Sequence, residues 1–241
     1  MYATFKPAAQ NIIMPENVAR PQFPGAHLVV TYKRGRVIYA EGDSVDKCYQ
    51  VCAGAVRVYG LISDGRRQVV SFHLAGETFG FEAASKHRFF AEAIADTRII
   101  VSARHPIQEH SPELLALALG GMKRAQEHLL VIGRQCAVER VAAFLMDLSN
   151  RLGGVRQVRL PMSRQDIADY LALTTESVSR AMTELKERKV IALHHVRTVD
   201  IIKPGALRSL CHQAAPRTRA SITPALDAFD PCNGAVRNAP R

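Results

Sequence analysis

The segment spanning residues 162–180 constrains this chain most, because it has the pattern of two short helices joined by a tight turn. Ser163 can cap the first helix, and Asp166 stands three residues later in a capping-box position. Thr174 can cap the second helix, and Ala172-Leu173 forms the turn between them. Each helix carries apolar residues at helical spacing on one face: Ile167, Tyr170 and Leu171 on the first, and Val178, Met182 and Leu185 on the second. The segment therefore predicts a helix-turn-helix.

Three polar side chains would leave the second helix along one outward edge: Glu176, Ser179 and Arg180. A helix-turn-helix places this part of its second helix in the major groove of DNA. There, Arg180 can donate two hydrogen bonds to a guanine, Glu176 can accept from a cytosine amine, and Ser179 can approach a thymine methyl group. The alternative is that Glu176 and Arg180 form only a surface ion pair, which would be worth ~0.3–0.5 kcal/mol. We interpret the edge as base-reading.

Five further polar residues are candidates for contacts to the DNA backbone: Ser163, Arg164, Gln165, Thr175 and Ser177. The first three lie where the first helix would cross the backbone, and its peptide N–H groups and the Arg164 charge suit phosphate. The other two lie near the start of the second helix, where they either contact phosphate or solvate the helix end.

The charge of the chain favours the same partner. The net charge is +10, and residues 156–212 carry ten basic against six acidic side chains, so the basic excess is densest around the helix-turn-helix. A polyanion such as double-stranded DNA fits this distribution better than ordinary solubility charge does.

Residues 27–104 have a different pattern, in which short β-branched and aromatic segments alternate with glycine-containing turns. Asp64-Gly65 is a strong hairpin signal. Such spacing predicts an all-β barrel or sandwich. The expected strands are 28–32, 37–39, 48–51, 56–59, 68–72 and 98–101.

A helical pattern follows over residues 112–135, and its apolar stripe is longer than one small domain needs. We expect a dimer seam here, because helix-turn-helix proteins usually bind paired half-sites; the alternative is a helix buried within its own chain. The candidate seam residues are Leu114, Leu115, Ala118, Met122, Ala125, Leu129 and Ile132.

The remaining segments predict a further helix, a strand, a hairpin wing and two terminal segments without regular structure. A second helix is expected over residues 137–152, then a strand at 157–160. After the helix-turn-helix, 190–193 and 198–202 pair as a hairpin wing. Residues 1–26 and 213–241 lack periodicity, which predicts a flexible arm and a disordered tail.

Several classes of protein are disfavoured. No apolar run approaches 18 residues, and the N-terminus lacks an export signal, so we expect no membrane segment. Five scattered cysteines suit reduced thiols in the cytoplasm. The sequence has no catalytic cluster, phosphate-binding loop or metal-spaced ligand set, so we do not expect an enzyme.

Taken together, the motifs resemble those of the CRP/FNR transcription regulators over residues 27–212. The shared motifs are Gly35, Glu41-Gly-Asp43, Gly54, Gly65, Gly76-Glu77, Gly80 and Glu176-Ser-Val-Ser-Arg180. The segments 160–171 and 76–82 are similar to those of the FixK branch.

The resemblance implies an α+β fold in three parts: an N-terminal, jelly-roll-like β-roll of the sensor type (27–110), a long dimerisation helix (111–136) and a C-terminal winged helix-turn-helix (137–212). It also implies a cytoplasmic homodimer that acts with RNA polymerase, mainly as an activator of microaerobic and nitrogen-fixation genes. The implied operator is a TTG-N8-CAA-type palindrome, with Glu176, Ser179 and Arg180 at the base-contacting positions of the family motif.

The cysteines make no credible ligand set for an iron–sulfur cluster. We expect Cys48, Cys52 and Cys136 to be small buried side chains, and Cys232 lies in the expected tail. Cys211, near the end of the folded region, is the candidate for redox control.

The sensor half also lacks the usual nucleotide motif. Where cyclic-nucleotide sensors of this fold carry Arg-Ser/Thr-Ala, this chain has Phe89 and Phe90 after Arg88, and the rings would fill the pocket. His73 is a weak candidate for a haem ligand. We therefore expect a regulator without cofactor or small-molecule effector; the alternative is an effector-gated regulator that uses a redox thiol, haem or a cyclic nucleotide.

Overall fold

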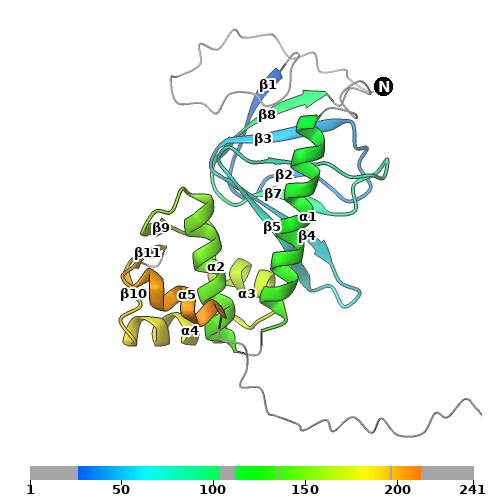
Figure 1. Ribbon diagram of the computed structural model, residues 1–241. Helices are drawn as coiled ribbons and strands as arrows, with labels where there is room; N and C mark the ends of the chain where they lie inside the picture. Colours follow the sequence, from blue (N-terminus) through cyan, green and yellow to red (C-terminus); the bar gives the residue numbers. More distant parts are fainter. Residues whose placement is uncertain (1–26, 104–111, 135, 196, 213–241) are drawn as a thin grey trace, which may run out of the picture.

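A computed structural model describes residues 27–103, 112–134, 136–195 and 197–212. The expected N-terminal arm and C-terminal tail lie outside these residues. Figure 1 shows the strands of residues 27–103 gathered at one end and the shorter helices, together with the strands of residues 157–201, at the other, with the long helix of residues 112–132 extending between them. This is the α+β arrangement that the sequence predicted: a β-roll, a long helix and a winged helix-turn-helix.

The β-roll consists of two four-stranded sheets whose paired strands are all antiparallel. The strand orders are β1-β8-β3-β6 and β2-β7-β4-β5. The bounds are β1 (His27–Tyr32), β2 (Val37–Tyr39), β3 (Lys47–Ala53), β4 (Ala55–Leu61), β5 (Arg67–Leu74), β6 (Thr78–Phe79), β7 (Phe90–Ala93) and β8 (Thr97–Ala103). Asp64-Gly65 turns the β4–β5 hairpin as predicted, and the amide of Gly65 donates to the carbonyl of Ile62 at 2.8 Å.

Two of these strands were missed by the sequence prediction, which found only six in this region. β6 has two residues, too few for a periodic signal. β7 is internal to its sheet, between β2 and β4, but its sequence Phe-Ala-Glu-Ala has no β-branched residue. The position of β7 in the sheet therefore depends on its pairing with β2 and β4, which are distant in the sequence.

The second half contains α1 (Pro112–Ile132), α2 (Ala137–Arg151), β9 (Gln157–Arg159), α3 (Arg164–Leu171), α4 (Thr175–Glu187), β10 (Ile191–His195), β11 (Thr198–Ile201) and α5 (Pro204–His212). Helices α3 and α4 are the predicted helix-turn-helix, and β10 and β11 are the predicted wing, joined by β9 into a three-stranded sheet. Helix α5 was not predicted. It begins at Pro204, a residue that suits the first turn of a helix, and packs on α2.

One continuous apolar core joins the β-roll to the helices. Phe72 on β5 packs against Tyr170 of α3, with ring centroids 5.2 Å apart, and against Phe144 of α2 at 6.3 Å. Val69 and Leu74 of β5 belong to the same buried cluster as the inward faces of α2, α3 and α4. Burial of this shared surface stabilises the contact between the two halves of the chain.

The burial of the cysteines agrees only in part with the prediction. Cys48 and Cys52 are buried on β3 as expected, but the prediction for Cys136 was wrong: it is exposed, at the position that caps the N-terminus of α2. Cys211 is half-buried on α5, and burial raises the pKa of its thiol. Within the described ranges, no helix is long and apolar enough to cross a membrane.

Candidate DNA-binding surface

Helix α3 begins with the predicted capping box. The Ser163 hydroxyl accepts a hydrogen bond from the backbone N–H of Asp166 at 3.1 Å. The Asp166 carboxylate in turn accepts from the backbone N–H and the hydroxyl of Ser163, at 2.9 and 2.7 Å. These bonds satisfy donors that a helix N-terminus leaves unpaired, and they fix where α3 starts.

The turn between α3 and α4 uses a left-handed residue that is not glycine. Ala172 has φ +51°, a conformation that costs about 1 kcal/mol or more for a residue with a Cβ. Arg140 of α2 braces this turn, because its guanidinium donates to the carbonyls of Leu171 and Ala172 at 3.1 and 3.2 Å. The amide of Leu173 also donates to the carbonyl of Ala168 at 3.0 Å. The turn is therefore held although its backbone is strained.

Helix α4 presents the predicted edge to solvent. Thr174 caps it by accepting from the backbone N–H of Ser177 at 3.1 Å. Its inward face is fully buried, and the residues on that face are Val178, Ala181, Met182 and Leu185. Burial of that face fixes the rotation of the helix about its axis, so Glu176, Ser179 and Arg180 are all exposed.

The three edge residues already interact with their own helix. Arg180 pairs with Glu176 at 2.5 Å, and the Ser179 hydroxyl donates to the carbonyl of Thr175 at 2.9 Å. The ion pair considered as the alternative is therefore present. The Arg180 and Glu176 side chains are 79% and 70% exposed, and a pair this exposed contributes little to stability and can be exchanged for base contacts at small cost.

Arg164 lies in a small hollow of about 100 Å³ between the start of α3 and the wing, beside Arg197. Its Nη1 is buried and has no hydrogen-bond partner among the described residues. Burial lowers the pKa of the Arg164 guanidinium from its ordinary value. A guanidinium at a helix N-terminus, with a second arginine lining the same hollow, forms a positive site that suits a phosphate.

The other candidates for backbone contacts have internal partners. Ser177 shares a hydrogen bond with the Thr174 hydroxyl at 2.9 Å. Thr175 donates to the side-chain oxygen of Gln165 at 2.6 Å, and the Gln165 amide donates to Asp169 at 2.6 Å. Gln165 and Thr175 are therefore hydrogen-bonded to each other, and the Thr175 hydroxyl would have to give up this bond to donate to a phosphate.

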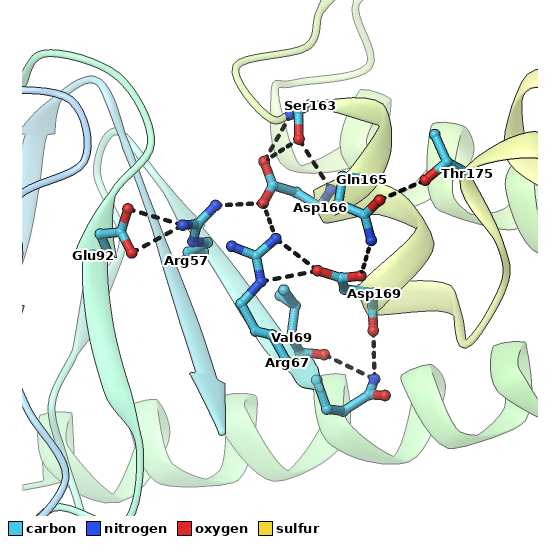
Figure 2. Close-up of polar contacts among 10 residues, drawn as sticks. Arg57, Arg67, Val69, Glu92, Ser163, Gln165, Asp166, Asp169 and Thr175 are labelled. Atoms are coloured by element: carbon cyan, nitrogen blue, oxygen red, sulfur yellow. Dashed lines mark hydrogen bonds and ion pairs between the residues drawn. The ribbon is translucent and has the colours of Figure 1, made fainter. Parts of the chain in front are cut away.

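Sequence reasoning missed a set of charged residues that joins α3 to the β-roll (Figure 2). Arg57 of β4 contacts both Glu92, at 2.8 Å, and Asp166, through a short ion pair. Arg67 of β5 contacts Asp166 at 2.8 Å and donates twice to Asp169, at 2.6 and 2.9 Å. Local patterns could not reveal the pairs to α3, because Arg57 and Asp166 are 109 residues apart and Arg67 and Asp169 are 102 apart.

The electrostatics of Asp166 reflect these partners. Burial by itself would raise its pKa, but hydrogen bonds from Ser163 and the nearby charges of Arg57 and Arg67 hold the pKa of this carboxyl below its ordinary value. Asp166 is therefore a carboxylate throughout the physiological range, and it offsets part of the charge of two half-buried arginines.

A crevice of about 700 Å³ separates the β-roll from α1 and α2. Phe89 and His73 of the β-roll line it, opposite Arg124 and His128 of α1. Arg151 of α2 also lines it and binds both carboxylate oxygens of Glu77, at 2.9 and 2.7 Å. The hydrogen bonds and charge of Arg151 outweigh the effect of burial and hold the pKa of Glu77 below its ordinary value. Phe90 points to other neighbours, and its ring stacks on Tyr59 at 5.3 Å.

The described part of α1 carries exposed apolar side chains. Of the candidate seam residues, Leu115, Ala118, Met122, Ala125 and Leu129 are exposed and Ile132 is half-buried, whereas the side chain of Leu114 lies outside the described part. The spacing of these six, alternately three and four residues, is that of the a and d positions of a heptad. Leu129 is 69% exposed, which is unusual for a leucine on a long helix of an isolated chain.

Comparison with known proteins agrees with this geometry. Residues 29–108 match the cyclic nucleotide-binding domain family, and residues 139–210 match the Crp-like helix-turn-helix domain family. The nitrogen fixation regulation protein FixK of Rhizobium meliloti strain 1021 is 65% identical over 212 residues, which cover 88% of this chain and 100% of that protein. FixK of Azorhizobium caulinodans is 41% identical, over 74% of this chain and 77% of that protein. The solved structure of FixK2 from Bradyrhizobium japonicum superimposes with a TM-score of 0.74 at 38% identity, and covers 79% of this chain and 100% of that one.

Proposed function

The chain belongs to the FixK branch of the CRP/FNR family of DNA-binding transcription regulators, and from that premise we propose that it is a homodimer that reads a palindromic operator without a small-molecule effector. The proposed targets are microaerobic and nitrogen-fixation genes, which it mainly activates together with RNA polymerase in the cytoplasm. The names of its FixK relatives support the link to nitrogen fixation.

The observation that carries the DNA-reading proposal is the open edge of α4. Glu176, Ser179 and Arg180 leave the helix on its exposed side, while Val178 and Met182 hold the opposite side in the core. A carboxylate, a hydroxyl and a guanidinium on one helical edge match the donors and acceptors of a TTG half-site in the major groove. The hollow at Arg164 supports a phosphate contact next to this edge.

The homodimer proposal is supported by the apolar row on α1. Leu115, Met122 and Leu129 are exposed along the same heptad row, and a second copy of α1 would bury them. Two-fold symmetry would then present two copies of α4 to the DNA, which is why the operator is proposed to be an inverted repeat of the TTG-N8-CAA type.

The effector-free proposal is supported by the partners of Glu77. In a nucleotide sensor this acidic residue would be available to a ligand, but here both of its oxygens are bound by Arg151. A nucleotide would have to displace an ion pair in which Arg151 is only 14% exposed, and Arg151 would keep only its longer ion pair to Asp147, at 3.2 Å, and its hydrogen bond to the Phe72 carbonyl. Phe89 also stands where the family's phosphate-binding hydroxyl would be.

The proposal is tested with the purified full-length protein, by sedimentation and by titration of a labelled TTG-N8-CAA duplex. We expect a dimer that prefers this duplex over a scrambled one, and we expect cyclic nucleotides to leave the affinity unchanged. Leu129→Glu places a charge in the proposed seam, so it should give monomers whose operator affinity is lower by about 100-fold or more, because bivalent binding is lost.

Gln126→Glu is the matched control, since it introduces the same charge at an exposed position of α1 outside the apolar row. It should remain dimeric and bind normally. A Leu129→Glu protein that keeps the dimer mass would refute the seam, and nucleotide-dependent operator binding would refute the effector-free proposal.

A further inference from the structure

The β-roll contacts the helix-turn-helix through charged groups as well as through apolar packing. We call the set Arg57, Arg67, Asp166 and Asp169 the polar clasp (Figure 2). Its arginines come from the neighbouring strands β4 and β5, and its carboxylates lie one turn apart on α3. The clasp thus joins the β-roll directly to the first helix of the DNA-binding motif.

The clasp continues to the first residue of the recognition helix. Arg67 donates to one oxygen of Asp169, and the other oxygen of Asp169 accepts from Gln165 at 2.6 Å. The side-chain oxygen Oε1 of Gln165 accepts from the Thr175 hydroxyl at 2.6 Å. Thr175 begins α4 and directly precedes Glu176. An unbroken row of hydrogen bonds therefore runs from the β-roll to Thr175, the residue before the base-reading edge, as Figure 2 shows.

The clasp is shielded enough to resist exchange with water. The side chains of Arg57 and Asp166 are 15% and 5% exposed, and those of Arg67 and Asp169 are 23% and 12% exposed. Separation of such a pair would leave an uncompensated, partly buried charge. Hydrogen bonds to a planar guanidinium also depend on direction, so the clasp is satisfied in one orientation of α3.

Apolar packing constrains the angle of α3 less sharply than these polar contacts do. The contact of Phe72 with Tyr170 holds the two halves together, but burial of apolar surface depends weakly on angle. The backbone carbonyl of Asp169 also accepts from Gln68 at 2.6 Å, which adds a third polar contact between β5 and α3. The polar contacts therefore define the angle at which α3, and with it α4, is presented.

We propose that Arg67 and Asp169 are positioning residues for DNA recognition: through Gln165 and Thr175 they hold the recognition helix in the orientation that reads the operator. This inference rests on the proposed operator-binding function. It assigns the β-roll a part in DNA reading that needs no bound ligand, because the constraint is carried by side chains of the chain itself.

The test compares Arg67→Ala with Arg66→Ala in the full-length protein. Arg66 is the adjacent residue on the same hairpin and loses the same charge, but it is 78% exposed and pairs with Asp64, not with α3. We expect Arg67→Ala to weaken binding to the TTG-N8-CAA duplex by roughly 5- to 30-fold, with non-specific binding unchanged, and Arg66→Ala to have little effect. Asp169→Asn, which preserves shape, should reproduce the loss and provides a second measurement if Arg67→Ala folds poorly.

A double-mutant cycle separates positioning from a general loss of stability. If the row of hydrogen bonds transmits the constraint, Thr175→Ala weakens operator binding in the wild-type background but adds little to Arg67→Ala. If Thr175 acts only by its own phosphate contact, its effect is the same in both backgrounds, and the inference is overturned. Wild-type affinity for Arg67→Ala and Asp169→Asn would also overturn it.

The wild-type protein distinguishes this failure from failure of the proposed function. If the wild type binds the palindrome no better than a scrambled duplex, the operator-reading proposal is wrong. If the wild type discriminates and both clasp variants do so equally well, only the positioning role is wrong.

Discussion

Replacement of Arg180 by alanine should abolish recognition of one base pair in each half-site while leaving the fold intact. Arg180 is 79% exposed, and its only ion pair among the described residues is with Glu176, one turn away on the same helix. In the complex, the same guanidinium would instead donate to O6 and N7 of a guanine. Because the side chain packs against nothing in the core, its role in binding can be separated from any role in folding.

The two possible roles of Arg180 differ in magnitude. As an exposed i,i+4 pair it contributes ~0.3–0.5 kcal/mol to stability. As a bidentate contact it contributes ~1–3 kcal/mol of discrimination, or about 5- to 150-fold in affinity, for each half-site. Arg180→Ala should therefore unfold at nearly the wild-type temperature but lose most of its preference for the guanine.

The assay is anisotropy titration of two duplexes, one with the intact half-sites and one with the guanine of each replaced. Arg188→Ala is the control: Arg188 caps the opposite end of α4 and also pairs with a glutamate, Glu184, at i,i+4. We expect the wild type and Arg188→Ala to separate the duplexes, and Arg180→Ala to bind them almost equally. If Arg180→Ala still preferred the guanine, or if Arg188→Ala lost the preference equally, the assignment of the base contact would be wrong.

Two further predictions concern stability. Burial lowers the pKa of His73 to about 4, against ~6.5 in an unfolded chain, so the folded state binds fewer protons; stability is full above pH 6.5 and is lost as the pH falls toward 4. The free energy of unfolding should therefore differ between pH 7.5 and pH 5.0, and His73→Gln should make that difference smaller by about 2 kcal/mol. Urea titration at fixed protein concentration measures it at both pH values. If the difference is the same in the variant, His73 is not a buried neutral imidazole. Ala172→Gly relieves the left-handed turn and should stabilise the protein by about 0.5–1 kcal/mol, seen as a higher melting temperature; a lower one would mean that the turn is not strained.

The helix-turn-helix was predictable because its signals are local. Ser163 and Thr174 cap the helices that follow them, and each cap needs only the next three residues to be recognised. The outward edge of α4 followed from the spacing of Val178 and Met182, since 3.6 residues per turn determines which side chains face the core. The wing was predictable for the same reason, as two β-branched segments separated by a short tip.

What the sequence did not reveal depends on contacts between distant segments. Asp166 was recognised as part of a capping box, but nothing near it indicates that its carboxylate also binds Arg57 and Arg67. Strand β7 has little strand propensity and is specified by its neighbours β2 and β4. Cys136 was expected to be buried from its residue type, whereas its position before α2 exposes it.

In the effector-free regulator proposed above, the β-roll would act through its own polar contacts to the helices. Glu77 lies in the family's Gly-Glu motif, yet Arg151 of α2 binds it, and Arg67 binds α3 from the same strand that leads to this turn. Both contacts connect the β-roll to the helices around the DNA-binding motif, where an effector in a nucleotide sensor would act. A ligand shifts an equilibrium only by the difference in its affinity for two conformations. Ion pairs at these positions would favour one conformation in the same way, and under the effector-free proposal control would depend on how much protein is made.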